Sequence, residues 1–194
     1  MIVNSVHLET NRLIIRDHIA SDLDDLETLI GNKANMTYIM DLYAKDREAV
    51  EENLKTAMDA IAKPNRDKYF FAIIEKLSGS YVGEIGFTLL EEGLAEMGYF
   101  IKQPFWNRGI VTEAGEAVLE YAFCNLGLHK MVTGCVKEND GSERVMIKLG
   151  FSKEGELKAH QMVQGEWKDR VIYGYLKNDY LIQHRGQYES NSNI

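Results

Sequence analysis

Apolar residues in the first third of the chain mark one strand and two helices. The run NRLIIRD predicts a short strand at residues 12–16. Apolar side chains then recur at helical spacing between Ser21, which can cap a helix, and Gly31, which can end one. Residues 46–62 repeat the helical pattern with one charged side, and Pro64 breaks it.

The middle of the chain has the pattern of three strands followed by a helix. Residues 68–76, 79–90 and 93–102 are rich in aromatic and β-branched side chains, and the turns between them are short. These strands are therefore expected to be antiparallel neighbours. Residues 108–126 return to helical spacing.

The last third predicts a strand in KMVTGCVK, a short helix in NDGSERVMIKLG and a hairpin that turns at VQGE. The strand–helix–strand passage over residues 94–137 implies one parallel pair of strands inside a mainly antiparallel sheet. If these two strands splay apart, the slot between them can hold a long phosphorylated molecule.

Length and composition favour one domain over residues 1–180. The chain has 194 residues and is 45% hydrophobic, enough for a sizeable core. Residues 181–194 form a polar tail that we expect to be partly disordered. A net charge of −8 argues against a general nucleic-acid binder and favours cationic partners, although solubility alone explains it equally well.

The two cysteines, Cys124 and Cys135, form no disulfide framework, which indicates a reducing compartment. No signal-peptide pattern and no apolar run long enough for a bilayer is present, so we expect a cytoplasmic protein without a membrane partner. The five histidines lack metal-ligand spacing, and we expect no metal.

The stretch FWNRGIVTEA, residues 105–114, joins a predicted strand to a predicted helix. Backbone N–H groups at a helix start lack intrahelical partners and can bind an anion. Gly109 would let that anion approach the main chain closely, and Arg108 adds a positive charge. An ordinary helix start explains the turn taken alone.

Three segments together resemble the Gcn5-related N-acetyltransferases (GNAT): AEMGYFIKQPFWNRGIVTEAGEAVLEYAF, KENDGSERVMIKLGF and GEWKDRVIYGYL. With the opening LETNRLIIRD, the resemblance spans residues 7–178 and is similar to the branch that includes ribosomal-protein N-terminal (alanine/serine) acetyltransferases. It implies a mixed α+β fold, with a mostly antiparallel sheet of about six to seven strands, one locally parallel splayed pair and about four flanking helices.

The family's phosphate loop, R/Q-x-x-G-x-G/A, falls on residues 106–111. Gly109 is kept, whereas Trp106 replaces Arg or Gln, Asn107 replaces a frequent glycine and Val111 replaces a small residue. The resemblance implies that backbone N–H groups in this loop hold the pyrophosphate of acetyl-CoA. The coenzyme A site that it implies comprises Phe100, Ile101, Trp106, Asn107, Arg108, Gly109, Ile110, Val111, Thr112, Asn139 and Ser142.

Acetyl transfer to an amine requires a base, and Glu96 is the first candidate because several family members carry a glutamate there. A surface or ion-paired role explains Glu96 equally well. Glu84 on the neighbouring predicted strand is a second candidate base. Tyr99 and His160 are candidates for contact with the amine acceptor.

The leaving thiolate needs a proton, and here the chain departs from the family. Many members carry a tyrosine where this chain has Met146, which cannot donate a proton. Ser142 or water can serve instead, or the thiolate can leave unprotonated. Asn139 is expected both to cap the short helix and to face the pantetheine arm.

The resemblance therefore predicts an acetyl-CoA-dependent N-acetyltransferase that acts on a small-molecule or peptide amine. A catalytically idle acyl-CoA-binding module is the alternative, because the tyrosine is missing and the identity of the base is undecided. A dinucleotide-binding oxidoreductase is excluded, because no G-x-G-x-x-G follows the first strand. A homodimer is expected only by analogy with this branch.

Overall fold

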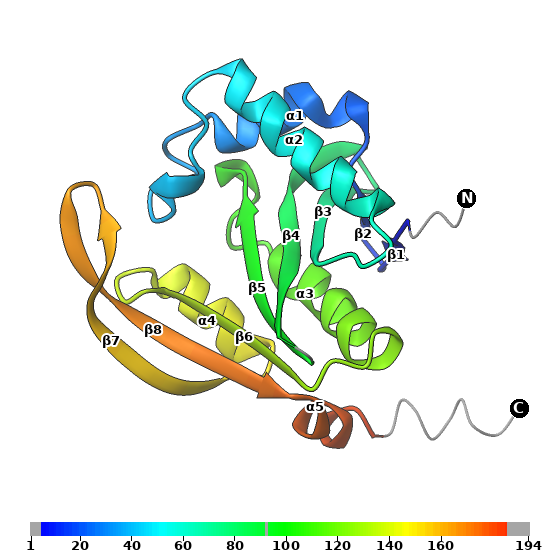
Figure 1. Ribbon diagram of the computed structural model, residues 1–194, viewed down its shortest axis with the longest axis vertical. Helices are drawn as coiled ribbons and strands as arrows, with labels where there is room; N and C mark the ends of the chain where they lie inside the picture. The colour runs from blue at the N-terminus through cyan, green and yellow to red at the C-terminus, as the bar shows by residue number, and fades with distance from the viewer. Residues whose placement is uncertain (1–4, 92, 186–194) are drawn as a thin grey trace, which may run out of the picture.

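The computed structural model describes residues 5–91 and 93–185, which form a single eight-stranded sheet flanked by helices (Figure 1). The strand order is β1-β2-β3-β4-β5-β6-β8-β7. The strands are β1 (His7–Glu9), β2 (Leu13–Asp17), β3 (Lys68–Glu75), β4 (Ser80–Glu91), β5 (Leu94–Ile101), β6 (Lys130–Val136), β7 (Ser152–Val163) and β8 (Glu166–Leu176).

Five α-helices accompany the sheet in the part of the chain that the structure describes. They are α1 (Leu23–Ile30), α2 (Arg47–Ala62), α3 (Ile110–Glu120), α4 (Asp140–Lys148) and α5 (Lys177–Gln183). The predicted mixed α+β architecture is confirmed, with slightly more strands and helices than expected. The additional strand is β1, a three-residue edge strand too short to leave a pattern in the sequence.

Every neighbouring pair of strands is antiparallel except β5 and β6, which run parallel. The predicted parallel pair is therefore confirmed. The closing hairpin turns at Gln164 (φ 51°) and Gly165 (φ 86°), the left-handed pair that a tight two-residue turn requires.

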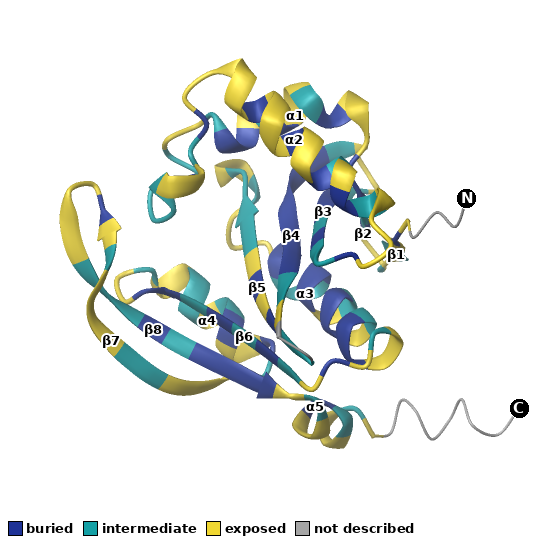
Figure 2. Ribbon diagram, in the orientation of Figure 1, coloured by how far each residue is buried: buried dark blue, intermediate teal, exposed yellow. Residues whose placement is uncertain are grey.

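Both faces of the sheet bury apolar side chains. Helix α3 packs Ile110, Ala114 and Val118 against one face, and α1 and α2 pack Leu26, Leu29 and other residues against the opposite face. Strand β4 is buried from 81 to 87, whereas the edge strand β7 is mostly exposed (Figure 2). No helix in the described ranges is long and apolar enough to cross a bilayer.

Two predicted boundaries differ in the structure. Ser21 does not cap α1; it lies in a 3-10 turn, Ala20–Asp22, because the Asp22 carboxylate accepts hydrogen bonds from Arg16 and the Ile19 N–H and holds that turn. Residues 181–183, assigned to the tail, complete helix α5, and residues 186–194 lie outside the described part of the chain.

A buried ion pair ties the start of the sheet to the end of the α2–β3 connection. Asp17 at the end of β2 accepts two hydrogen bonds from the Arg66 guanidinium, one of them at 3.0 Å, and a third from the Val6 N–H at 2.7 Å. The two side chains are 3% and 2% exposed, and Arg66 also stacks 4.3 Å from the Tyr69 ring. The fold therefore depends on each charge having its partner.

Asp17→Asn should lower the free energy of unfolding by about 3–5 kcal/mol, because it removes the buried carboxylate charge that Asp17 places against the Arg66 guanidinium. Urea unfolding followed by circular dichroism measures this difference. The matched control is Asp67→Asn, since Asp67 is an exposed carboxylate beside Lys63 and should change stability little. Equal stability of the Asp17 variant and the control would contradict the role given to the pair.

Candidate active site

The parallel pairing of β5 and β6 covers three residues on each strand, Leu94–Glu96 against 130–132. Beyond this point the strands diverge (Figure 1), while β5 stays paired with β4 as far as Ile101 and β6 stays paired with β8 as far as Val136. The Thr133 hydroxyl donates to the Met97 carbonyl at 3.0 Å, so a buried side chain bridges the point where the ladder ends. Among the described strands, none pairs with this edge of β5 beyond Glu96, and we call this edge and the space between the two diverging strands the slot.

The turn after β5 leads into α3 through two left-handed residues. Asn107 has φ 57° and Gly109 has φ 72°, and Gly109 is the N-cap of α3 without a side-chain hydrogen bond to the helix. The first N–H groups of α3 have no intrahelical partner, so this turn offers backbone donors and the positive end of the helix dipole. Such an arrangement at the end of β5 is suited to bind an anion, and we refer to it as the anion-binding turn.

Arg108 in this turn is held by an acidic side chain. Its Nη2 lies 2.6 Å from Glu75 Oε1, and its guanidinium lies 5.1 Å from the Phe105 ring. Arg12 reaches the same turn, because its Nη1 donates to the Arg108 carbonyl at 3.1 Å and its Nε donates to Glu113. Two guanidinium groups therefore border the anion-binding turn.

Helix α4 begins beside the slot, and Asn139 caps it as predicted. The Asn139 Oδ1 accepts from the Ser142 N–H at 3.1 Å. The Ser142 hydroxyl lies 2.9 Å from the Tyr99 hydroxyl, so a hydrogen bond joins β5 to α4. Burial raises the pKa of Tyr99, and its phenol stays protonated at neutral pH. Met146 is fully buried in the core.

Glu96 lies where the parallel pairing ends, on the face of β5 that also carries Gly98 and Phe100. Its side chain is 45% exposed, and Oε1 pairs with Arg170 Nη2 of β8 at 2.9 Å. A Cβ placed on Gly98 would meet no heavy atom within 4 Å, so the space beside Glu96 is open. The sequence did not indicate Arg170, because it lies on β8, which β6 separates from β5 in the sheet, and the sequence does not reveal this strand order.

Glu84 belongs to a buried polar group on the same face of the sheet. It is 5% exposed, and its Oε1 lies 3.7 Å from His18 Nε2. The other ring nitrogen, Nδ1, lies 3.4 Å from Asp22, which is itself bound by Arg16. Burial lowers the pKa of His18, but the nearby carboxylates of Asp22 and Glu84 outweigh it and raise the pKa to about 9.

His18 was also missed from the sequence, where one histidine after a short strand gave no signal. Glu84 is sequestered with this imidazolium, whereas Glu96 faces open space. Of the two predicted bases, Glu96 is therefore the exposed one and Glu84 the buried one.

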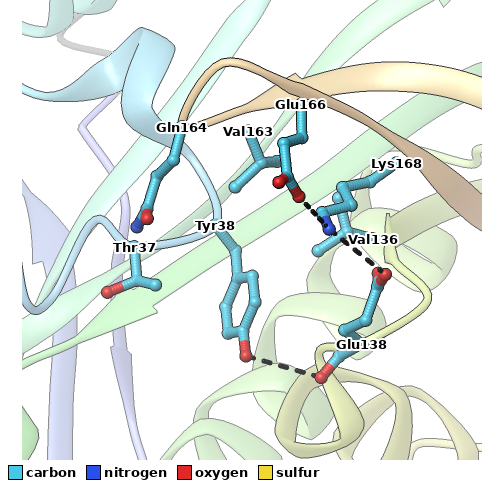
Figure 3. Close-up of a pocket in the computed structure, with 8 residues that line it drawn as sticks. All are labelled: Thr37, Tyr38, Val136, Glu138, Val163, Gln164, Glu166 and Lys168. Carbon is cyan, nitrogen blue, oxygen red and sulfur yellow. Dashed lines mark hydrogen bonds and ion pairs between the residues drawn. The ribbon is translucent and has the colours of Figure 1, made fainter.

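A pocket of about 320 Å³ lies between the α1–α2 connection, the end of β6 and the tip of the closing hairpin (Figure 3). Val136 and Val163 line it with the Tyr38 ring, whose hydroxyl donates to the Glu138 carbonyl at 3.4 Å. Its other lining residues are Thr37, Glu138, Gln164, Glu166 and Lys168. Among its charged groups, two carboxylates outnumber one ammonium.

His160 is exposed and lies outside the residues that line this pocket. It sits where β7 bulges between Leu157 and Gln161, next to Ala159 with φ 46°. Its contact with an acceptor stays a prediction.

The two cysteines differ in environment. Burial raises the pKa of Cys135, near the start of α4, to about 11. Cys124 is exposed in the turn that follows α3. Within the described residues, no group of three or more His, Cys, Asp or Glu side chains is arranged to hold a metal ion.

A family profile described as an acetyltransferase (GNAT) domain matches residues 12–152. The chain belongs to the GNAT family. It is an acyltransferase of the N-acetyltransferase type, as the resemblance in its sequence predicted.

Related sequences agree with this assignment. The chain is 29% identical over 176 residues to the uncharacterized N-acetyltransferase YnaD of Bacillus subtilis (strain 168), covering 90% of this GNAT chain and 99% of the relative. It is 30% identical over 91 residues to spermidine N(1)-acetyltransferase of Escherichia coli (strain K12), 47% of this chain and 49% of the relative. It is 25% identical over 107 residues to the [ribosomal protein uS5]-alanine N-acetyltransferase of the same organism, 54% of this chain and 55% of the relative.

Solved structures share the fold. A GNAT-family acetyltransferase from Bacillus anthracis superposes with a TM-score of 0.80 at 27% identity, covering 89% of this chain and 99% of that one. The spermidine N-acetyltransferase of Vibrio cholerae, solved with CoA and spermine, gives 0.78 at 20% identity over 89% of this chain and 99% of that one. The latter likeness concerns the fold alone.

The His18 group predicts a pH-dependent stability. The pKa of His18 is about 9 in the folded chain and 6.5 in an unfolded one. The contribution of His18 to the free energy of unfolding is therefore complete below pH 6.5 and is lost as the pH rises through 9. The free energy of unfolding should therefore fall between pH 6 and pH 9.5, and His18→Gln should flatten this slope. His160→Gln, which changes an exposed histidine, should leave the slope as it is; a similar slope in both variants would argue against the assignment.

Proposed function

We propose that this GNAT enzyme is a cytoplasmic, acetyl-CoA-dependent N-acetyltransferase that moves the acetyl group to a primary amine by direct attack in a ternary complex. The observation that carries the proposal is the divergence of β5 and β6 after Glu96, combined with the turn at the far end of β5 where α3 begins. A long phosphorylated molecule needs both features, a slot with free strand edge and a phosphate site at its end.

Residues of the turn and the slot are suited to hold coenzyme A. Backbone N–H groups from Asn107 to Thr112 would bind the pyrophosphate, and Arg108 would exchange Glu75 for a phosphate oxygen. The edge of β5 through Phe100 and Ile101 would align the pantetheine arm with Asn139. When bound, acetyl-CoA supplies an acetyl thioester that an amine can attack.

The chain's own groups would then move protons and stabilise charge. Glu96 would accept the proton of the attacking amine, directly or through water. N–H groups on the slot edge of β5 would stabilise negative charge on the acetyl oxygen. Ser142, whose hydroxyl lies 2.9 Å from the Tyr99 hydroxyl, would donate a proton to the departing sulfur and take a proton back from solvent water.

Direct attack is favoured because neither cysteine suits a covalent step. The thiolate is the nucleophilic form, and the raised pKa of Cys135, about 11, keeps its thiol protonated near neutral pH. Cys124 lies beyond the end of α3, whereas the anion-binding turn lies at the start of that helix.

The acceptor would be a protein N-terminus or a small cationic amine. The pocket beside Tyr38 is open to both, because it combines an apolar wall with carboxylates. Relatives named for both classes, a ribosomal-protein acetyltransferase and a spermidine acetyltransferase, support this range of acceptors. Within the family, Met146 in place of tyrosine keeps a non-catalytic acyl-CoA-binding module as the second candidate.

Thiol release from acetyl-CoA, measured against N-terminal peptides, polyamines, aminoglycosides and amino acids, tests the proposal. Release with one class of amine supports the enzyme and identifies its acceptor. Coenzyme A binding is titrated in parallel. Binding without thiol release for any amine would favour the non-catalytic binding module. Failure to bind coenzyme A would reject the assignment of the turn.

Gly109→Asp should weaken coenzyme A binding about tenfold or more, because it places a negative charge beside the pyrophosphate. Isothermal titration with coenzyme A measures the change. Gly109→Asn is the matched control: asparagine has the same shape, tolerates a positive φ better than most residues and carries no charge. Equal affinities of the two variants for coenzyme A would contradict the assignment of the pyrophosphate site to this turn.

Glu96→Gln should lower kcat by about 10²–10⁴ and leave coenzyme A affinity unchanged, because the amide cannot accept the amine's proton. Initial rates across pH with the best amine, together with titration of coenzyme A, separate the two effects. Wild-type rates at every pH would eliminate Glu96 from the mechanism.

A further inference from the structure

The Arg170 guanidinium joins Glu96 to a second side chain. Its Nη2 donates to Glu96 Oε1 at 2.9 Å, and its Nη1 donates to Gln161 Oε1 at 3.2 Å. The Arg170 side chain is 23% exposed, about half the exposed fraction of Glu96. One planar group therefore fixes two neighbours with separate nitrogens, which an ammonium could not do in the same geometry.

Gln161 extends the connection to the acceptor side of the molecule. Its Nε2 donates to the Tyr38 carbonyl at 3.1 Å, and Tyr38 lines the pocket between the α1–α2 connection and the hairpin (Figure 3). Gln161 is the first residue to pair with β8 again after the bulge in β7. The bulge is held by the Ala159 N–H, which donates to Asp169 at 2.9 Å, and bulges commonly re-aim the side chains that follow.

These contacts solve a positioning problem for Glu96. A half-exposed glutamate at the edge of an open slot has several rotamers, and a base misplaced by about 1 Å can lose about a hundredfold in rate. Among the described residues, Arg170 pairs with Oε1 of Glu96. Oε2 of Glu96 is therefore left to receive a proton.

We infer that Arg170 is a positioning residue that holds Glu96 at the slot and ties it, through Gln161, to the Tyr38 backbone of the acceptor pocket. The base and the segment that lines the acceptor pocket are thereby kept in one arrangement. This inference rests on the proposed role of Glu96 as the base.

A double-mutant cycle tests it, with kcat and KM measured for the best amine. Arg170→Gln should lower kcat about tenfold to a hundredfold, with coenzyme A affinity unchanged. In the Glu96→Gln background, where no carboxylate remains to be positioned, Arg170→Gln should lower kcat less than about twofold. Losses that multiply in the double variant would mean that Arg170 acts independently of Glu96 and would overturn the inference.

Conservative and matched variants separate positioning from folding. Arg170→Lys keeps the charge and should retain part of kcat. Gln161→Leu cuts the contact with Tyr38 while keeping Arg170, and should lower kcat in the wild-type background but not in the Glu96→Gln background. This second cycle decides the question if Arg170→Gln unfolds. Lys153→Gln removes an exposed cation from the same hairpin and should leave both kcat and KM unchanged.

The outcomes distinguish this inference from the proposed function. If no amine causes thiol release from acetyl-CoA, the proposed enzymatic function is rejected. If Glu96→Gln keeps full activity, Glu96 is not the base, and the positioning role of Arg170 is rejected with it. Activity lost in Glu96→Gln but kept in Arg170→Gln and Gln161→Leu rejects the positioning role alone.

Discussion

The limited pairing of β5 with β6 determines where everything else in the site can lie. Three residues on each strand pair in parallel, and then β6 follows β8 while β5 follows β4. A backbone edge that loses its partner inside a protein must find another one, because an unpaired buried polar group is costly. Thr133 supplies the first such partner, to the Met97 carbonyl, and the Trp106 indole supplies another, to the Ile101 carbonyl at 2.8 Å. The strand edge between these two contacts faces the slot.

The helices around the slot follow from the same geometry. Strand β5 is followed by the turn at Asn107–Gly109 and then by α3. Strand β6 is followed by the cap at Asn139 and then by α4. Each strand of the diverging pair is thus followed by a helix N-terminus at the open end of the slot, which suits a ligand with phosphate groups. The face of β5 that carries Glu96 and Phe100 is turned towards α1 and α2.

Charge is arranged differently on the two sides of this site. Around the α3 turn, the cations Arg12 and Arg108 are held in place by ion pairs with Glu113 and Glu75. On the face of β5 and β4 towards α1 and α2, Glu96 is exposed and paired with Arg170, whereas Glu84 is buried with His18. Two carboxylates that looked alike in the sequence therefore have different environments. A negative charge that a substrate can reach and one that stabilises the core serve different purposes.

The sequence by itself determined the order and type of most elements, the single parallel pair, the cap at Asn139 and the family. These features depend on local periodicity, on turn and capping chemistry, and on short motifs that stay contiguous along the chain. Only the tertiary structure decided that β1 joins the sheet, that Asp22 replaces Ser21 in organising the start of α1, and that Glu84 is sequestered. The same holds for Arg170 and Glu96, which are 74 residues apart and meet across β6, because Arg170 lies on β8 and Glu96 on β5. Contacts of this kind depend on register and side-chain direction across neighbouring strands, and a single sequence does not specify which residues will face one another.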